Sequence, residues 1–137
     1  MDAEKYKGYF DMLSKWMYLR NTGCFLTDHK LLKNRIAVYG YGKIGQRFVE
    51  ELTLSGNPPQ YIIDKGSSLV SLISERTTLA YELKAVDVIV VTVVFDYIDI
   101  EKQLIQKLGN NTNGTRIVSI NSIINDLLQE LTDEYLI

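Results

Sequence analysis

Residues 38–47 read "VYGYGKIGQR", and their three glycines separate two different apolar patterns. The run "RIAVYG" (35–40) is β-branched and almost continuously apolar, as in a strand buried on both faces of a parallel sheet. From Ile44 to Leu54 the apolar residues recur at helical spacing, and "SGNPP" (55–59) then forbids continuation. This stretch therefore predicts a strand, a tight turn and a helix.

The three glycines, Gly40, Gly42 and Gly45, have the spacing of a dinucleotide-binding turn. In such a turn the first glycine lets the chain reverse, the second lets the backbone approach a pyrophosphate, and the third lets the helix pack close to the strand. Asp64 follows Gly45 by 19 residues and ends the strand-like "QYIID" (60–64), where a carboxylate can accept hydrogen bonds from ribose hydroxyls. Turn and acid together predict a nucleotide site.

Five more residues are expected at this site. Lys43 adds positive charge at the start of the helix, beside Ile44, and Tyr41 inside the turn either covers the site or stacks on a ligand. Thr92, at the carboxyl end of the most apolar strand, can bond to a ribose or a ring amide. The strand-end carboxylate repels a 2′-phosphate and favours NAD over NADP, although Lys65 blurs that preference.

The segment "YGYGKIGQRFVEEL" (39–52) is similar to the glycine-rich segment of NAD-binding Rossmann domains, most closely that of the D-2-hydroxyacid dehydrogenases. Those enzymes also need an Arg, a Glu and a His downstream of the turn, in a longer chain. The only histidine here, His29, lies upstream, so the resemblance does not carry the dehydrogenase activity over.

A broader likeness covers roughly residues 15–128 and rests on "IAVYGYGKIG", "YIIDK", "VDVIVVTVV" and "RIVSI". Over these residues the chain resembles the small Rossmann-like domains of bacterial polysaccharide and nucleotide-sugar biosynthesis proteins. That resemblance implies a fold and a nucleotide or nucleotide-sugar ligand, and it implies no reaction.

The rest of the chain alternates strands and helices, which predicts an α/β fold. We expect a Rossmann-like, open, mostly parallel five-stranded sheet in order 3-2-1-4-5, with helices on both faces and one or two extra N-terminal helices. The segment 65–86 has no pattern that distinguishes strand from helix, and we predict one short strand in it. The predicted domains are a helical segment (1–33), a nucleotide-binding domain (34–131) and an acidic tail (132–137).

The predicted elements outside the turn are a helix over Tyr6–Leu19 that ends near Gly23, a short helix capped by Thr27 or Asp28, strands over 87–94 and 116–120, a helix over 98–108, and a closing helix capped by Asn121 or Ser122.

Composition sets further limits. The chain has 137 residues, of which 46% are hydrophobic, and this suits one domain with one core. A net charge of −2 gives no reason to expect nucleic acid or a membrane surface as partner, and no apolar run is long enough to span a bilayer. With a single cysteine, Cys24, and no zinc spacing, we expect a reduced, cytoplasmic protein without a metal.

Other side chains suggest simpler roles. His29 in a polar stretch is expected to be exposed, Cys24 to be a half-buried inert thiol, and Asp96 to cap the next helix, while Phe95 could line an apolar wall of the site. The aromatic stripe of the N-terminal helix is too wide to face water alone. It must be covered by the domain itself or by a second copy in a homodimer.

The leading functional hypothesis is a module that binds NAD(H) or a nucleotide sugar without catalysing a reaction by itself, since no acid, base or nucleophile pair stands out. One alternative is a small oxidoreductase or sugar-nucleotide-modifying enzyme that a partner subunit completes. Another is a scaffold domain in which the glycine turn serves packing alone.

Overall fold

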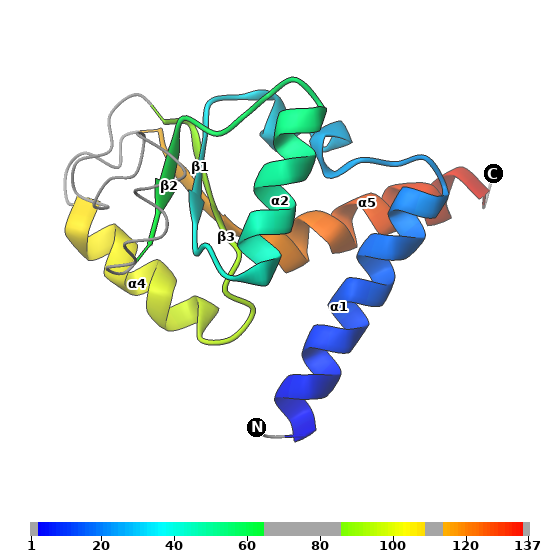
Figure 1. The fold of residues 1–137 in the computed structure, drawn as a ribbon, viewed down its shortest axis with the longest axis horizontal. Helices are drawn as coiled ribbons and strands as arrows, with labels where there is room; N and C mark the ends of the chain where they lie inside the picture. Colours follow the sequence, from blue (N-terminus) through cyan, green and yellow to red (C-terminus); the bar gives the residue numbers. More distant parts are fainter. Residues whose placement is uncertain (1–2, 65–85, 109–113, 136–137) are drawn as a thin grey trace.

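A computed structural model of the chain describes residues 3–64, 86–108 and 114–135. These residues form an α/β structure with a four-stranded parallel sheet, in the order β2-β1-β3-β4 (Figure 1). In chain order the elements are α1 (Ala3–Asn21), the 3₁₀ helices η1 (Leu26–Asp28) and η2 (Lys30–Lys33), β1 (Ile36–Tyr39), α2 (Lys43–Leu54), β2 (Tyr61–Ile63), β3 (Val88–Val91), α4 (Tyr97–Leu108), β4 (Arg116–Ser119) and α5 (Ile120–Tyr135).

The sheet is consistent with the predicted Rossmann-like α/β class but differs in strand count and order. Four strands are described where five were expected in order 3-2-1-4-5, and the described order is β2-β1-β3-β4. The third expected strand falls on residues 65–85, which lie outside the described residues. All three strand pairs are parallel, so every described strand ends at the same edge of the sheet.

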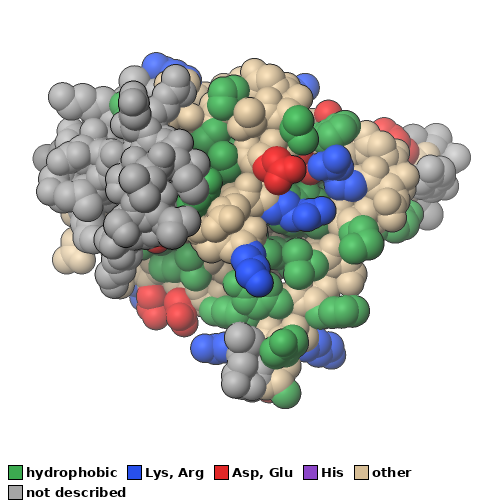
Figure 2. All heavy atoms as spheres, in the orientation of Figure 1, with side chains coloured by type: hydrophobic (Ala, Val, Ile, Leu, Met, Phe, Trp, Pro, Cys, Tyr) green, Lys and Arg blue, Asp and Glu red, His purple; other side chains and the backbone are tan. Residues whose placement is uncertain are grey.

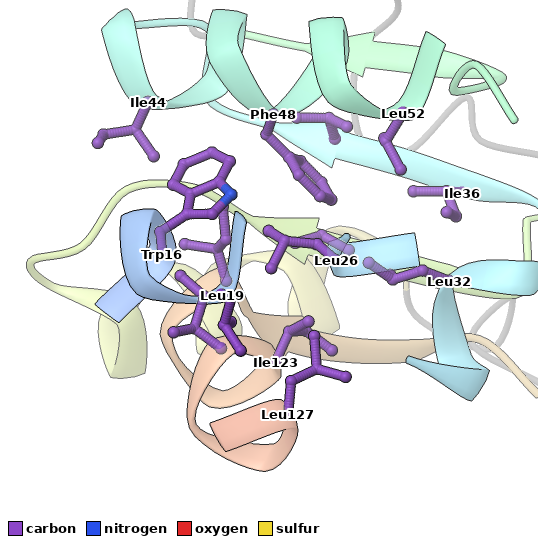
Figure 3. Close-up of a cluster of buried hydrophobic side chains, with 14 of the residues drawn as sticks. Trp16, Leu19, Leu26, Leu32, Ile36, Ile44, Phe48, Leu52, Ile123 and Leu127 are labelled. Carbon is purple, nitrogen blue, oxygen red and sulfur yellow. The ribbon is translucent and has the colours of Figure 1, made fainter. Parts of the chain in front are cut away.

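Alternate residues of the two central strands point to opposite faces of the sheet and create two cores. On one face, Val38 and Val90 join a large apolar cluster with α1, α2 and α5. Figure 3 shows Phe48 pointing from α2 into this cluster, toward Leu26 of η1, with Trp16 of α1 on its other side. On the other face, Ile89 and its neighbours pack against α4. Helices therefore cover both faces, as predicted.

The N-terminal helix is longer than expected and ends where expected. Gly23 has a φ of +84°, and the N–H of Cys24 bonds to the carbonyl of Leu19, which closes the helix end. The single short helix predicted after it is instead two 3₁₀ turns, with His29 between them.

The prediction that His29 is exposed was wrong, because its side chain is buried. Its Nδ1 accepts the N–H of Leu31 at 3.1 Å, and this leaves the hydrogen on Nε2, which lies 2.9 Å from a carboxylate oxygen of Asp126 in α5. His29 therefore joins the first 3₁₀ segment to the last helix, which is a structural role.

The last helix begins directly at the end of β4. Ser119 caps it through Oγ, which accepts the N–H of Ser122 at 3.0 Å, so neither Asn121 nor Ser122 is the cap that was predicted. The helix runs to Tyr135, through most of the segment expected to be an acidic tail. None of the described helices combines the length and the apolar character needed to cross a membrane.

Candidate functional site

Two of the three glycines in the turn between β1 and α2 are required by packing. Gly40 has a φ of +99°, and a Cβ there would lie 2.7 Å from the hydroxyl oxygen of Thr92. A Cβ on Gly45 would overlap the carbonyl oxygen of Gly40. Gly40 therefore reverses the chain and Gly45 lets α2 pack on the end of β1, as the sequence predicts.

Gly42 differs from both neighbours. Its φ of −73° is open to any residue, and a Cβ there would meet no described residue within 4 Å. It is the N-cap of α2, and it has no side chain that could accept a hydrogen bond from the first N–H groups of the helix. The first backbone hydrogen bond of α2 runs from the N–H of Gln46 to the Gly42 carbonyl. The N–H groups of Lys43, Ile44 and Gly45 consequently have no intrahelical partner and provide partial positive charge.

Thr92 was predicted to contact a ligand, but the structure turns it inward. Its side chain is buried, and its Oγ lies 2.9 Å from the carbonyl oxygen of Gly40 and 3.0 Å from that of Tyr39. The hydroxyl donates to these carbonyls and ties β3 to the glycine turn. The prediction placed Thr92 correctly beside the turn, where its buried hydroxyl finds its partners in these carbonyls, and its contact with a ligand stays a prediction.

The remaining predicted residues of the turn occupy different environments. Lys43 is exposed at the start of α2, whereas the side chain of Ile44 belongs to the core and leaves only its N–H for a ligand. Tyr41 is half-buried. Its backbone carbonyl accepts a hydrogen bond from the side-chain amide of Gln46 at 3.1 Å, which stabilises the turn. Lys65 lies outside the described residues.

A hollow of about 370 Å³ lies at the edge of the sheet where the strands end. Asp64 lines this hollow from the residue after β2, and Gly40 lines it from the residue after β1. Parallel pairing of the two strands brings these residues together from far apart in the sequence. Among the described residues, those that line the hollow are Tyr39, Gly40, Asp64, Val93, Asp96, Asp99, Ile100 and Gln103.

The charge around this hollow is negative. Three of the described lining residues, Asp64, Asp96 and Asp99, carry carboxylates, and none of the described ones is basic. Burial, together with the nearby negative charge of Asp64, raises the pKa of Tyr39 above its usual value. No cluster of His, Cys, Asp or Glu in the described part of the chain is arranged to hold a metal ion. The lining suits a neutral ligand group that is rich in hydrogen-bond donors.

Sequence reasoning did not find Asp99 and Gln103, which line the hollow from α4. Their position on the helix after the most apolar strand was a usable signal, because the start of that helix must lie at the carboxyl edge of the sheet. Asp96 stands at the start of α4 with a φ of +61°, and its carbonyl accepts the N–H of Ile100 at 3.0 Å. It thus takes part in starting the helix and also lines the hollow.

Phe95 was expected to line an apolar wall of the site, and it packs on α1 instead. Its ring meets that of Tyr9 edge to face at 4.8 Å, and the ammonium of Lys5 lies 5.5 Å from its centroid. The N-terminal half of α1 therefore lies beside the loop between β3 and α4.

Cys24 does not line the hollow. Burial in the first place, and the carboxylate of Asp28 after it, raise the pKa of the Cys24 thiol to about 11. A thiol with this pKa is almost entirely protonated at neutral pH, and this supports the prediction of an inert cysteine.

Comparison of the chain with family models, with curated proteins and with solved structures finds no match. The geometry of the turn and of the hollow beside it is therefore the basis for assigning a function.

Proposed function

We propose that this chain is a Rossmann-like nucleotide-binding module, with NAD(H) or a nucleotide sugar as its ligand, which acts in the cytoplasm without catalysing a reaction by itself. In this proposal the predicted five-stranded order applies to the whole sheet. Phosphates bind at the start of α2, and the attached ribose enters the hollow beside Asp64. The setting is bacterial polysaccharide or nucleotide-sugar metabolism, as the resemblance implies.

The observation that carries the proposal is the open space at Gly42. Packing explains Gly40 and Gly45, but neither the backbone angles nor the neighbours of Gly42 require a glycine. A glycine at that position gives a phosphate access to the free N–H groups of the first turn of α2. The exposed Lys43 adds a full positive charge at the same helix end.

The division of charge between the turn and the hollow supports a ligand with two parts. The helix start favours an anion, whereas the carboxylates of the hollow can accept hydrogen bonds from ribose hydroxyls or from the amino group of a base. A 2′-phosphate would face Asp64, Asp96 and Asp99, so the hollow favours NAD over NADP.

Isothermal titration calorimetry tests the proposal with NAD, NADH, NADP and UDP-sugars, and S-adenosylmethionine serves as a nucleoside ligand without phosphate. We expect binding of NAD(H) or of a UDP-sugar, with NADP weaker than NAD. Asp64→Asn should weaken this binding while the protein stays folded. Absence of heat and of a thermal shift with every ligand would remove the proposal.

The scaffold alternative is favoured by one observation, the internal use of Thr92, Gly40 and Gly45. Under this alternative the turn exists only to join β1, β3 and α2, and Gly42→Ala changes no binding and no cellular function. The enzyme alternative requires cofactor turnover that starts only when a partner subunit is added.

A further inference from the structure

The helix α1 presents apolar side chains on two faces. Its inner face packs into the core through Met12, Trp16 and Leu19. A second row, which we call the outer stripe, is exposed. It consists of Tyr6, Phe10, Leu13 and Met17, whose exposed fractions are 65%, 70%, 38% and 64%.

The outer stripe occupies a prominent position on the molecule. In Figure 1 the N-terminal half of α1 extends past the strand ends, away from the sheet. Figure 2 shows apolar side chains interspersed with basic ones over α1 and α2. An apolar row on a projecting helix is costly to leave in water and typically marks an interaction surface.

A groove adjoins the C-terminal half of the stripe. It lies between α1 and α2, has a volume of about 390 Å³, and is lined by Leu13, Met17, Arg20 and Arg47 among others. Arg20 is held by the buried carboxylate of Glu51, with an N–O distance of 2.7 Å. No hydrogen bond or ion pair joins the guanidinium of Arg47 to another described residue, so it is available to an incoming group.

We infer that the outer stripe is a homodimer interface in which two copies of α1 pack antiparallel. The stripe residues are spaced by four, three and four positions, a pattern that is the same when read from either end. A two-fold axis between Phe10 and Leu13 therefore brings Phe10 against the partner's Leu13, and Tyr6 against the partner's Met17. Such a self-complementary patch is what a two-fold dimer requires.

The ends of the stripe fit one another in this antiparallel register. Tyr6 of one copy reaches the groove of the other, where its ring can lie beside Arg20 and Arg47 in cation–π contact. A parallel pair would instead place Lys7 and Arg20 beside the same residues of the other copy, and the like charges would repel one another. A second copy in the antiparallel orientation is thus a better occupant than a parallel copy or an unrelated basic helix.

The available area predicts a weak dimer. Aromatic side chains bury about 150–250 Å² each, so the stripe offers on the order of 400 Å² per copy, and the pair buries about 800 Å². Stable interfaces bury about 1,200 Å² or more, and contacts of the groove and its arginines add to the stripe. We therefore expect an equilibrium between monomer and dimer at micromolar concentrations.

Sedimentation equilibrium across a range of concentrations tests this inference. The wild-type mass should rise toward twice that of one chain, whereas Phe10→Glu should stay monomeric. The matched control is Tyr18→Glu, which changes an exposed aromatic residue of the same helix outside the stripe and should still dimerise. A wild-type monomer at every concentration, or equal loss of dimer in both variants, would overturn the inference.

Cysteine cross-linking tests the register in a Cys24→Ser background. A mixture of the Tyr6→Cys and Met17→Cys variants should form a disulfide-linked heterodimer, and neither variant alone should cross-link. Cross-linking of each variant with itself would show a parallel pair and overturn the antiparallel assignment. Both substitutions are at exposed sites, and circular dichroism checks that the variants fold.

Discussion

The glycine turn has a packed side and an open side, and the two differ in what explains their residues. On the packed side every feature has an internal cause: Gly45 has no room for a side chain, and the Thr92 hydroxyl binds carbonyls of the turn. On the open side, Gly42 and the carboxylate of Asp64 border free space or a hollow. Internal packing therefore explains the first side completely, and the second side is where the proposed ligand would bind.

The largest effect should come from adding one methyl group on the packed side. Gly45→Ala places a Cβ against the backbone carbonyl of Gly40, which cannot move without separating α2 from β1. We expect a loss of stability on the order of 3 kcal/mol, measured by urea unfolding. An unchanged unfolding midpoint would show that the turn has slack and that the packed side is not closed.

A smaller loss should follow when the hydroxyl that holds the turn is removed. Thr92→Val keeps the shape but leaves the carbonyl of Gly40 without its donor, at a cost of about 1–3 kcal/mol. The matched control is Thr53→Val, because Thr53 is exposed and its hydroxyl bonds only to the Val49 carbonyl within α2, and there the change should be below about 0.5 kcal/mol. Equal effects at the two sites would argue against this role for Thr92.

On the open side, Gly42→Ala should separate stability from binding. The added methyl group has free space and an allowed φ, so the only expected cost is the N-cap preference for glycine over alanine, on the order of 1 kcal/mol. Affinity for the nucleotide identified by calorimetry should fall about tenfold or more, because the methyl group blocks close approach to the backbone. Full binding by this variant would favour the scaffold alternative.

The smallest effect concerns the charge inside the hollow. Burial and the charge of Asp64 raise the pKa of Tyr39, so the folded protein keeps this tyrosine protonated to higher pH than the unfolded chain does. The stabilising contribution is complete below the unfolded pKa and is lost as pH rises through the folded pKa. Asp64→Asn should lower the Tyr39 pKa, as measured by ultraviolet difference titration against the wild type. No difference would place Asp64 away from the hollow.

Much of the fold could be predicted, because strong local patterns produced it. The β-branched runs became β1, β2, β3 and β4, and Gly23 ended α1 in the expected left-handed conformation. Residues whose partners are distant in sequence could not be assigned in this way. His29 looked exposed among charged neighbours, yet it pairs with Asp126, which lies 97 positions away.

Glu51 shows the same limit more strongly. The sequence offers it as one of two adjacent acids on a helix, and nothing local distinguishes it from Glu50. In the structure Glu51 is buried, where its carboxylate accepts hydrogen bonds from the indole of Trp16, from Arg20 and from the N–H of Leu26. Only the approach of α1 and η1 to α2 supplies these donors, and a buried carboxylate needs them.

The order of strand, glycine turn, helix and acid was determined by the sequence alone, because backbone conformation and apolar periodicity are local properties. The roles of the individual residues in the turn were decided by the tertiary structure. The spacing suggested a role for each of Gly40, Gly42 and Gly45, but only the approach of β3 and Thr92 to the turn shows that packing requires two of them and leaves Gly42 open. Space around a residue is set by the whole packed chain, and therefore no local pattern could contain it.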